Sequence, residues 1–258
     1  MPGSDKPLDN LVSVITPVFN GAKYIHSSVA AVASQSIKVL EHIVIDDGSS
    51  DNTLQILQQL QHEYPHLKVL SQRNQGAGVA RNAGIAAAEG KYIAFLDSDD
   101  GWLKNKLEQQ IGFMETTGAV FSYGDYDEVD EVSGQTIASF KLPQRLTYRQ
   151  LLNGCPIGCL TAAYNQLALG KCYMPLVRRG QDWGLWLAIT RTGADAVKYP
   201  GNCARYNRLQ VSLSKNKLKK MLDVYQIYST EERLNPVRCG YHLFRHFLYV
   251  RKKHKATS

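Results

Sequence analysis

The sequence predicts an α/β fold in which a mostly parallel sheet, flanked by helices, continues into a mixed second half. Three observations lead to this prediction. Apolar runs alternate with helical periodicities over the first hundred residues, as in β-α units whose strands run parallel. Small polar residues follow the apolar runs at the expected strand ends. Beyond Gly101 the alternation stops, and helix and strand signals no longer follow one another regularly.

The first half is expected to contain four buried strands, each a short apolar run that ends at polar residues. They cover residues 11–16, 41–46, 67–70 and 91–96. Three helices are expected to alternate with them: over residues 22–36, over a segment carrying Leu54, Leu57 and Leu60, and over the alanine-rich residues 77–88. Pro17 ends the first strand, and the small polar residues 47–52 favour a tight turn and a helix N-cap.

The second half carries weaker signals. Its expected elements are helices over residues 103–116, from 178 onward and over 215–230, a strand near 119–123 and a turn at Ser133-Gly134. The sequence has no recognisable internal repeat or linker. We therefore expect one continuous domain over residues 1–232, with halves at 1–100 and 101–232, followed by a basic amphipathic C-terminal tail over 233–258.

The composition is that of an ordinary globular protein, with 44% apolar and 21% charged residues in a chain of 258. Its five cysteines are scattered without a CxxC pair, which argues against a secreted disulfide framework or a structural zinc site and favours a reducing cytoplasm. The first apolar run, residues 11–19, is too short and too interrupted for a signal peptide, and no stretch reaches the length of a spanning helix.

The net charge of +7 is concentrated in the last part of the chain. Residues 215–258 hold 11 Lys and Arg against 3 Asp and Glu, which leaves 19 basic and 20 acidic residues in the rest of the sequence. Because so nearly neutral a domain lacks the field of a nucleic-acid-binding protein, we expect no nucleic-acid partner.

The strongest chemical signal is Asp97-Ser98-Asp99 at the end of the fourth strand. Alternate carboxylates at such a point can converge on one hard divalent cation, Mn²⁺ or Mg²⁺, and leave positions open for phosphate oxygens. The alternative is structural, with Asp97 or Asp99 capping a helix that starts near Trp102.

Two neighbouring strand ends also carry compact polar residues. Asp46 and Asp47 end the second strand, where a carboxylate can accept hydrogen bonds from a base or a ribose, and Thr16, Pro17 and Asn20 end the first. Because the carboxyl ends of parallel strands meet at one edge of a sheet, these residues predict a crevice for a nucleotide whose diphosphate reaches toward the fourth strand end.

Four motifs make the sequence recognisable. They are Val12-Ser-Val-Ile-Thr-Pro-Val-Phe-Asn, Ile45-Asp-Asp-Gly-Ser-Ser-Asp-Asn-Thr, Asn74-Gln-Gly-Ala-Gly-Val-Ala-Arg-Asn-Ala-Gly and Phe95-Leu-Asp-Ser-Asp-Asp. In order and spacing they resemble the family 2 glycosyltransferases of GT-A fold over roughly the first 100 residues. The resemblance implies a GT-A, Rossmann-like fold and an inverting, metal-dependent transfer of a sugar from a nucleotide diphosphate. Residues 1–100 would then bind the nucleotide sugar and residues 101–232 the acceptor.

The resemblance also implies roles for particular residues. Asp99 would hold the metal and Asp47 the base, Asp97 would lie near the ribose or sugar, and Thr16 and Pro17 would lie beside the nucleoside. The full set of expected donor-binding residues is Thr16, Pro17, Asn20, Asp46, Asp47, Arg73, Arg81, Asp97 and Ser98.

A general base is expected in the second half. In family 2 it commonly stands in an acidic-Asp-Trp helix start, which Gln181-Asp182-Trp183 resembles except that Gln181 replaces the usual Glu. Asp182 alone can deprotonate an acceptor hydroxyl as it attacks the anomeric carbon, so the departure bears more on acceptor contacts than on the base. The structural alternative makes Asp182 an N-cap and Trp183 and Trp186 core residues.

Arginines near the glycine-rich turn have two interpretations. Arg81 either positions the donor sugar or phosphate or makes a buried ion pair with Asp97 or Asp99. Further on, residues 205–214 resemble a basic segment that folds over the diphosphate, with shorter spacing than the family has. Its weak candidates are Arg205, Arg208 and Ser212.

Three other functions compete with this prediction. Gly76-Ala-Gly78-Val-Ala-Arg81 is similar to a dinucleotide-binding fingerprint, but Arg81 occupies the position where close packing needs a small residue. A phosphatase would carry its nucleophilic aspartate on the first strand, where this chain has Thr16. A non-catalytic sugar-nucleotide-binding or regulatory protein is the main alternative, because of Gln181 and the altered segment 205–214.

The tail offers a second binding surface. Leu243, Phe244, Phe247 and Leu248 form a helical stripe among basic residues, which suits either anionic lipid headgroups or packing on the domain. We predict a glycosyltransferase with a UDP-sugar donor and a saccharide or glycolipid acceptor in polysaccharide or surface-glycan synthesis. It would be cytoplasmic, with the tail a candidate for peripheral contact at the inner face of the membrane.

Overall fold

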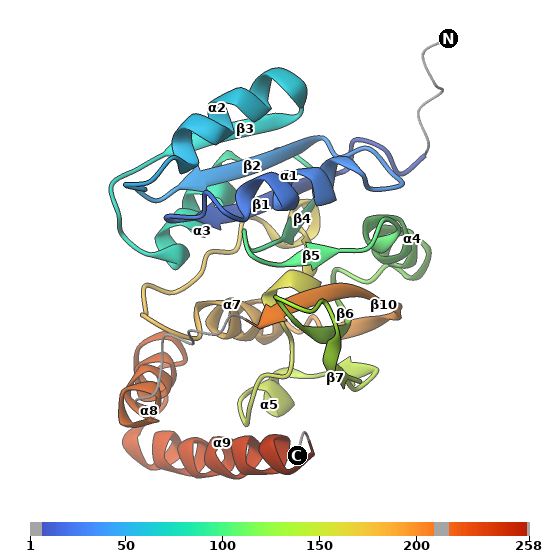
Figure 1. Cartoon of the computed structure of the whole chain (residues 1–258). Helices are drawn as coiled ribbons and strands as arrows, with labels where there is room; N and C mark the ends of the chain where they lie inside the picture. The colour runs from blue at the N-terminus through green and yellow to red at the C-terminus, as the bar shows by residue number, and fades with distance from the viewer. Residues whose placement is uncertain (1–6, 209–216, 257–258) are drawn as a thin grey trace.

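The computed structural model describes residues 7–208 and 217–256 (Figure 1). Its strands join into one ten-stranded sheet in the order β3-β2-β1-β4-β9-β6-β10-β5, with β7 paired to β6 and β8 to β10. The four strands of the first half run parallel, and the strands added by the second half pair mostly antiparallel. The predicted α/β fold with a mixed second half is confirmed.

The elements of the first half follow the predicted order. They are β1 (Val12–Val18), α1 (Ile25–Ala33), β2 (Glu41–Asp46), α2 (Thr53–Glu63), β3 (Leu67–Ser71), α3 (Ala77–Ala87) and β4 (Tyr92–Phe95). β1, β2 and β4 are buried along their whole length, as expected for strands of a parallel sheet covered on both faces. α3 lies close on this sheet at Gly84, where an added Cβ would come within 2.8 Å of Ile15 and Ile45.

The second half contains more short elements than the sequence predicts. They are β5 (Gly101–Trp102), α4 (Lys106–Thr117), β6 (Phe121–Asp130), β7 (Thr136–Phe140), β8 (Arg145–Leu146), α5 (Tyr148–Leu151), η1 (Cys159–Thr161), β9 (Ala163–Asn165), α6 (Gln166–Leu169), α7 (Gln181–Arg191) and β10 (Ala196–Arg208). The predicted helix start at 103 is wrong because Trp102 pairs with Ala204 across the sheet and donates its indole N–H to the Leu160 carbonyl at 2.8 Å. These long-range partners hold Gly101 and Trp102 in a strand, and α4 begins only after a turn at residues 104–105.

The core of the second half is built around Trp186 of α7, which is fully buried. Its ring stacks on Phe121 with the centroids 4.9 Å apart and meets Phe95 edge-on at 5.8 Å. Strands β4 and β6 and helix α7 thus share one aromatic cluster, which fixes α7 against the sheet edge where the polar loops emerge.

The chain ends in three consecutive helical elements. α8 (Lys217–Gln226) continues into a π-helical turn, η2 (Ile227–Glu231), and α9 (Pro236–Ala256) follows beside them (Figure 1). Cys239 and Leu243 of α9 pack on the core cluster that contains Trp186, so one face of the predicted tail helix packs on the domain. No helix in the described part of the chain is both long and apolar enough to cross a membrane.

Candidate active site

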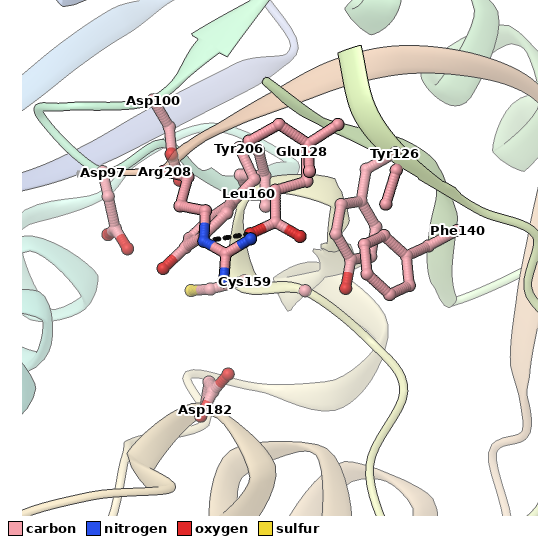
Figure 2. Close-up of a pocket in the computed structure, with 13 residues that line it drawn as sticks. Asp97, Asp100, Tyr126, Glu128, Phe140, Cys159, Leu160, Asp182, Tyr206 and Arg208 are labelled. Atoms are coloured by element: carbon pink, nitrogen blue, oxygen red, sulfur yellow. Dashed lines mark ion pairs between the residues drawn. The ribbon is translucent and has the colours of Figure 1, made fainter. Parts of the chain in front are cut away.

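A cavity of about 650 Å³ opens between the loop after β4 and the start of α7 (Figure 2). Its lining residues come from six segments of the chain. They are Asp97, Asp100, Tyr126, Glu128, Ile137, Ala138, Phe140, Gly158, Cys159, Leu160, Asp182, Tyr206 and Arg208. Figure 2 shows Asp97 and Asp182 approaching this space from facing walls. The fold thus brings together two aspartates that the sequence singled out for different roles.

Asp97 is held by Arg81. The guanidinium of Arg81, which is almost completely buried, makes an ion pair with the Asp97 carboxylate. Burial by itself lowers the pKa of Arg81, but the charge of Asp97 and its hydrogen bond, together with the charges of Cys159 and Asp182, raise the pKa above its ordinary value. The ion pair that the sequence left as one alternative is therefore present, and it leaves Asp97 part-exposed toward the cavity as a fixed acceptor.

Asp99 and Asp100 lie in a crowded acidic loop. Asp100, not Asp99, lines the cavity, and its carboxylate accepts the backbone N–H of Asn207 at 3.1 Å. The Asn207 amide in turn donates to the Asp99 carbonyl at 2.5 Å. Burial raises the pKa of both carboxyls, and the charge of Asp97 adds to the effect on each. The alternative in which Asp97 or Asp99 caps a helix is wrong, because α4 begins at Lys106 after Asn105.

The chemistry of this loop fits a divalent cation. Clustered carboxylates whose charges disfavour one another are hard oxygen donors that a cation would stabilise. Within the described residues no group of three or more His, Cys, Asp or Glu is arranged to hold an ion by itself. A Mg²⁺-type site usually takes one or two carboxylates from the protein and completes its shell with water and substrate phosphates.

Asp182 stands in the first turn of α7, at the cavity. The helix begins at Gln181 with Gly180 as its N-cap, so the alternative that makes Asp182 the cap is wrong. Burial raises the pKa of Asp182, and the positive charge of Arg81 opposes this. The two following tryptophans, Trp183 and Trp186, are core residues as the same alternative proposed. They fix the helix that carries Asp182 at the cavity.

Gln181 lies away from the cavity that Asp182 lines. Its amide donates to the Val177 carbonyl at 2.7 Å, and its side chain packs on Gly78 of α3. Both contacts belong to a second cleft, of about 390 Å³, between α3 and the loop before α7. A glutamate at this position could not donate to Val177 unless protonated, which gives a structural reason for the amide.

The residues at the end of β2 are tied into the neighbouring loop. The Asp47 carboxylate accepts the backbone N–H groups of Gln75 and Gly76 at 2.9 and 2.7 Å and the side chain of Gln72 at 2.7 Å. Asp46 accepts the N–H of Ser49 at 3.2 Å. Both aspartates are buried. The bonds of Asp47 shape the turn that follows β3, and the bond of Asp46 to Ser49 shapes the turn that follows β2.

The expected residues after β1 differ in their environments. The Thr16 hydroxyl is fully buried and lies 2.8 Å from the ring of His42, so it is satisfied inside the sheet. Pro17 is buried beside it. Asn20 is exposed and accepts the N–H of Ser50 at 2.8 Å. These residues lie outside the lining of the large cavity.

The remaining candidates on the donor side also differ in their exposure and in whether they line the cavity. Arg73 is exposed in the loop that Asp47 holds, and Ser98 is half-buried between the two predicted acidic positions. Arg208 lines the cavity and lies 3.4 Å from Glu128, whereas Arg205 is outside the lining. Ser212 lies outside the described residues.

Several cavity residues were not predicted from the sequence. Tyr126 and Phe140 stack with their ring centroids 4.7 Å apart across β6 and β7, and Tyr206 of β10 adds a third ring. Glu128 belongs to an acidic, tyrosine-rich stretch that was visible in the sequence without a role. Asp100 could have been found from the run Asp97-Ser-Asp-Asp, since any of its carboxylates could have faced the cavity.

Comparison with known proteins agrees with this geometry. Residues 13–169 match the model of the family described as glycosyl transferase family 2. A putative teichuronic acid biosynthesis glycosyltransferase, TuaG, from Bacillus subtilis is 38% identical over 227 residues, which are 87% of this chain and 90% of that protein. WfgD from Escherichia coli, a UDP-Glc:alpha-D-GlcNAc-diphosphoundecaprenol beta-1,3-glucosyltransferase, is 36% identical over 248 residues, 95% of this chain and 96% of that protein.

Solved structures support the fold. Residues 1–349 of TarS from S. aureus, in complex with UDP-GlcNAc, superpose with a TM-score of 0.69 at 21% identity, over 92% of this chain and 71% of that one. The mannosyltransferase PcManGT from Pyrobaculum calidifontis, in complex with GDP-Man and Mn²⁺, gives a TM-score of 0.67 at 16% identity, over 94% of this chain and 70% of that one. With the family match covering more than half of the sequence, the chain belongs to glycosyl transferase family 2 and is a glycosyltransferase of GT-A fold.

Proposed function

We propose that this protein transfers a sugar from a UDP-sugar to a saccharide or lipid-linked saccharide acceptor, with inversion at the anomeric carbon. The observation that carries the proposal is the single cavity that holds both Asp97, fixed by Arg81, and Asp182. Inverting transfer needs an anchored donor on one side and a proton acceptor on the other, and this cavity offers a carboxylate for each.

The donor would bind at the strand ends. Asp47 and the loop that it holds would bind the base, with Asn20 and Arg73 exposed nearby and Asp97 near the ribose or sugar. The Asp47 carboxylate already accepts hydrogen bonds from that loop. A base that contacts Asp47 must therefore replace one of these donors or add a further hydrogen bond to the same carboxylate. UDP is favoured over other nucleotides because TarS is described in complex with UDP and with UDP-GlcNAc.

Asp182 would act as the general base. Its carboxylate accepts the proton of the acceptor hydroxyl while the oxygen attacks the anomeric carbon, on the face opposite the leaving nucleotide diphosphate. The new glycosidic bond forms as the bond to the diphosphate oxygen breaks, which inverts the anomeric configuration. Burial raises the pKa of Asp182, which makes its carboxylate a stronger proton acceptor than an exposed aspartate.

Asp99, with Asp100 beside it, would hold Mn²⁺ or Mg²⁺ together with the donor diphosphate. A bound cation would supply stabilisation of the negative charge that develops on the leaving diphosphate. Arg81 contributes from the protein itself by holding Asp97 in an ion pair at the cavity. The metal-dependent part of the proposal draws support from PcManGT, described in complex with Mn²⁺.

The acceptor would enter from the side of β6, β7 and β10. Tyr206 and the stacked pair Tyr126 and Phe140 offer ring faces there, and Glu128 offers a polar contact. The name of the E. coli relative specifies a diphosphoundecaprenol-linked acceptor and that of the B. subtilis relative teichuronic acid biosynthesis. We therefore favour surface-polysaccharide synthesis, carried out in the cytoplasm at the inner face of the membrane.

Calorimetric binding of UDP, with GDP and TDP as controls and with and without Mn²⁺, tests the donor site. We expect Mn²⁺-dependent UDP binding that is lost in Asp99→Ala and kept in Glu63→Ala, a control carboxylate exposed on α2. Absence of any diphosphate binding would contradict the donor assignment. Slow hydrolysis of a UDP-sugar by the wild type, lost in Asp182→Asn, would exclude the alternative of a non-catalytic sugar-nucleotide-binding protein.

A further inference from the structure

The C-terminal helix α9 has two apolar faces, and the domain covers one of them. On the covered face Cys239 is fully buried, the ring of His246 stacks on Trp183 with 5.0 Å between centroids, and His242 lies 3.2 Å from the side chain of Asn153. These contacts fix the rotation of α9 about its own axis. The opposite face is therefore presented outward in one orientation.

The outward face is unusually apolar for a protein surface. Val237, Tyr241, Phe244 and Leu248 follow one another at spacings of four, three and four residues, which places them in one stripe along the helix. Their exposed fractions are 82%, 56%, 59% and 45%, and Phe247 beside the stripe is 47% exposed. A contiguous exposed patch of this kind marks an interaction surface.

The neighbouring helix α8 also carries exposed apolar side chains. Met221, Leu222 and Tyr225 are 43%, 61% and 39% exposed. α8 and α9 lie next to each other in the fold (Figure 1). The apolar side chains thus come from two helices rather than from one isolated turn.

The charges around the stripe indicate what covers it. Arg238 and Arg245 are exposed on one flank and Arg251 on the other. No ion pair within the described residues involves these three arginines. The sequence from 236 to 256 contains no Asp or Glu. A second copy seated face to face would bring its own arginines against these, whereas an anionic lipid surface would pair with all of them.

We propose that the outward face of α9 docks on a bilayer containing anionic phospholipids, with the apolar stripe entering the interface and the arginines at the headgroups. The docking surface stands apart from the transferase chemistry, since none of its residues lines the cavity. It has one connection with the proposed reaction. His246 on the covered face stacks on Trp183, the residue that follows Asp182, so docking would hold the proposed base close to a membrane-bound acceptor.

Co-sedimentation of the full chain with vesicles tests the proposal without any substrate. One set contains phosphatidylcholine alone and the other about 30% phosphatidylglycerol, where we expect binding at least about tenfold stronger that weakens with added salt. The double variant Phe244→Gln and Leu248→Gln should lose at least about tenfold in affinity for the anionic vesicles. Leu167→Gln, which alters an exposed leucine on α6, should bind as the wild type does.

A second comparison tests the contribution of charge. The double variant Arg238→Gln and Arg245→Gln should bind the anionic vesicles more weakly and with less salt dependence than the wild type. Lys104→Gln, which removes an exposed charge elsewhere, is the control. Equal binding to both vesicle types, or binding that survives in the apolar double variant, would overturn the proposal. So would dimerisation in sedimentation velocity that the apolar double variant abolishes, since a second copy would then cover the face. UDP binding is measured on the same variants, and its retention separates failure of docking from failure of the proposed function.

Discussion

Replacement of Lys106 by methionine should stabilise the protein at neutral pH and make its stability less dependent on pH. Lys106 is fully buried at the start of α4, and its ammonium nitrogen lies 3.9 Å from the centroid of the Trp102 ring. That nitrogen has no hydrogen-bond partner in the structure. Burial lowers the pKa of Lys106 from its ordinary value of 10.5 to about 7.

The magnitude follows from this pKa difference. Each pKa unit corresponds to about 1.4 kcal/mol, so keeping Lys106 protonated in the folded state costs up to about 5 kcal/mol. The cation–π contact with Trp102 offsets up to about 2 kcal/mol of that cost. The penalty at pH 6.5 is therefore about 3–5 kcal/mol. Methionine has one side-chain heavy atom fewer than lysine, and the lost packing costs about 1 kcal/mol. Lys106→Met should therefore be about 2–4 kcal/mol more stable than the wild type at this pH.

The direction of the pH effect is fixed by which state binds the proton more tightly. The folded-state pKa lies below the unfolded one, so the unfolded chain holds more protons between about pH 7 and 10.5. The free energy of unfolding contributed by Lys106 is lowest below pH 7, rises through this interval and is constant above it. The variant lacks this rise, so the advantage of Lys106→Met should vanish by pH 10.5.

Urea unfolding followed by tryptophan fluorescence, at pH 6.5 and again near pH 10, measures the difference. Lys104→Met, two residues away and exposed, is the matched control and should follow the wild type at both pH values. A variant that is destabilised at pH 6.5, or whose difference from the wild type is the same at both pH values, would refute the reasoning. The pKa of Lys106 would then lie near its ordinary value in the folded protein, as it does for a solvated lysine.

Three further changes test the site and its support. Asp182→Asn should lower kcat by about 10²- to 10⁴-fold with an unchanged melting temperature; transferase activity near the wild-type level would remove Asp182 from the base role. Gln181→Glu should cost about 1–3 kcal/mol of stability, because it places a carboxylate oxygen against the Val177 carbonyl, and an unchanged urea midpoint would contradict this. Gly84→Ala should cost about 1–3 kcal/mol through overpacking against β1 and β2. Its control is Gly240→Ala, an open position on α9 that should keep or slightly raise the urea midpoint; equal midpoints for both variants would show that α3 can shift.

Much of the first half could be predicted because its signals are local. The run 41–46 is apolar enough to be a buried strand, and β2 covers those residues. The strand ends carry their polar residues at the positions where a parallel sheet gathers them. Four motifs in fixed order then identified the family, which the match over residues 13–169 confirms.

The second half was predicted less well because its elements depend on distant partners. β5 has two residues and exists because Gly101 and Trp102 pair with the end of β10. β9 has three residues and joins β4 to β6. Strands this short carry too little periodicity to be seen in the sequence, since their hydrogen bonds come from residues more than thirty positions away.

The tail illustrates the same limit in another way. Its apolar residues predicted one stripe with two alternative partners, a membrane or the domain. The structure divides them between two faces, with Leu243 packed on the core and Phe244 and Leu248 outward. Neighbouring residues on a helix differ in direction by about 100°, so only the rotation of α9 could decide which of them remains exposed.

The sequence by itself determined the family, the parallel first half and the residue types of the site. These depend on composition, order and local spacing, which are fully contained in the chain. Only the tertiary structure decided that Arg81 pairs with Asp97, that Asp100 rather than Asp99 faces the cavity, and that Gln181 supports a loop. The physical reason is that an ion pair, an orientation or a close contact depends on where distant segments meet, and packing of the whole chain sets those positions.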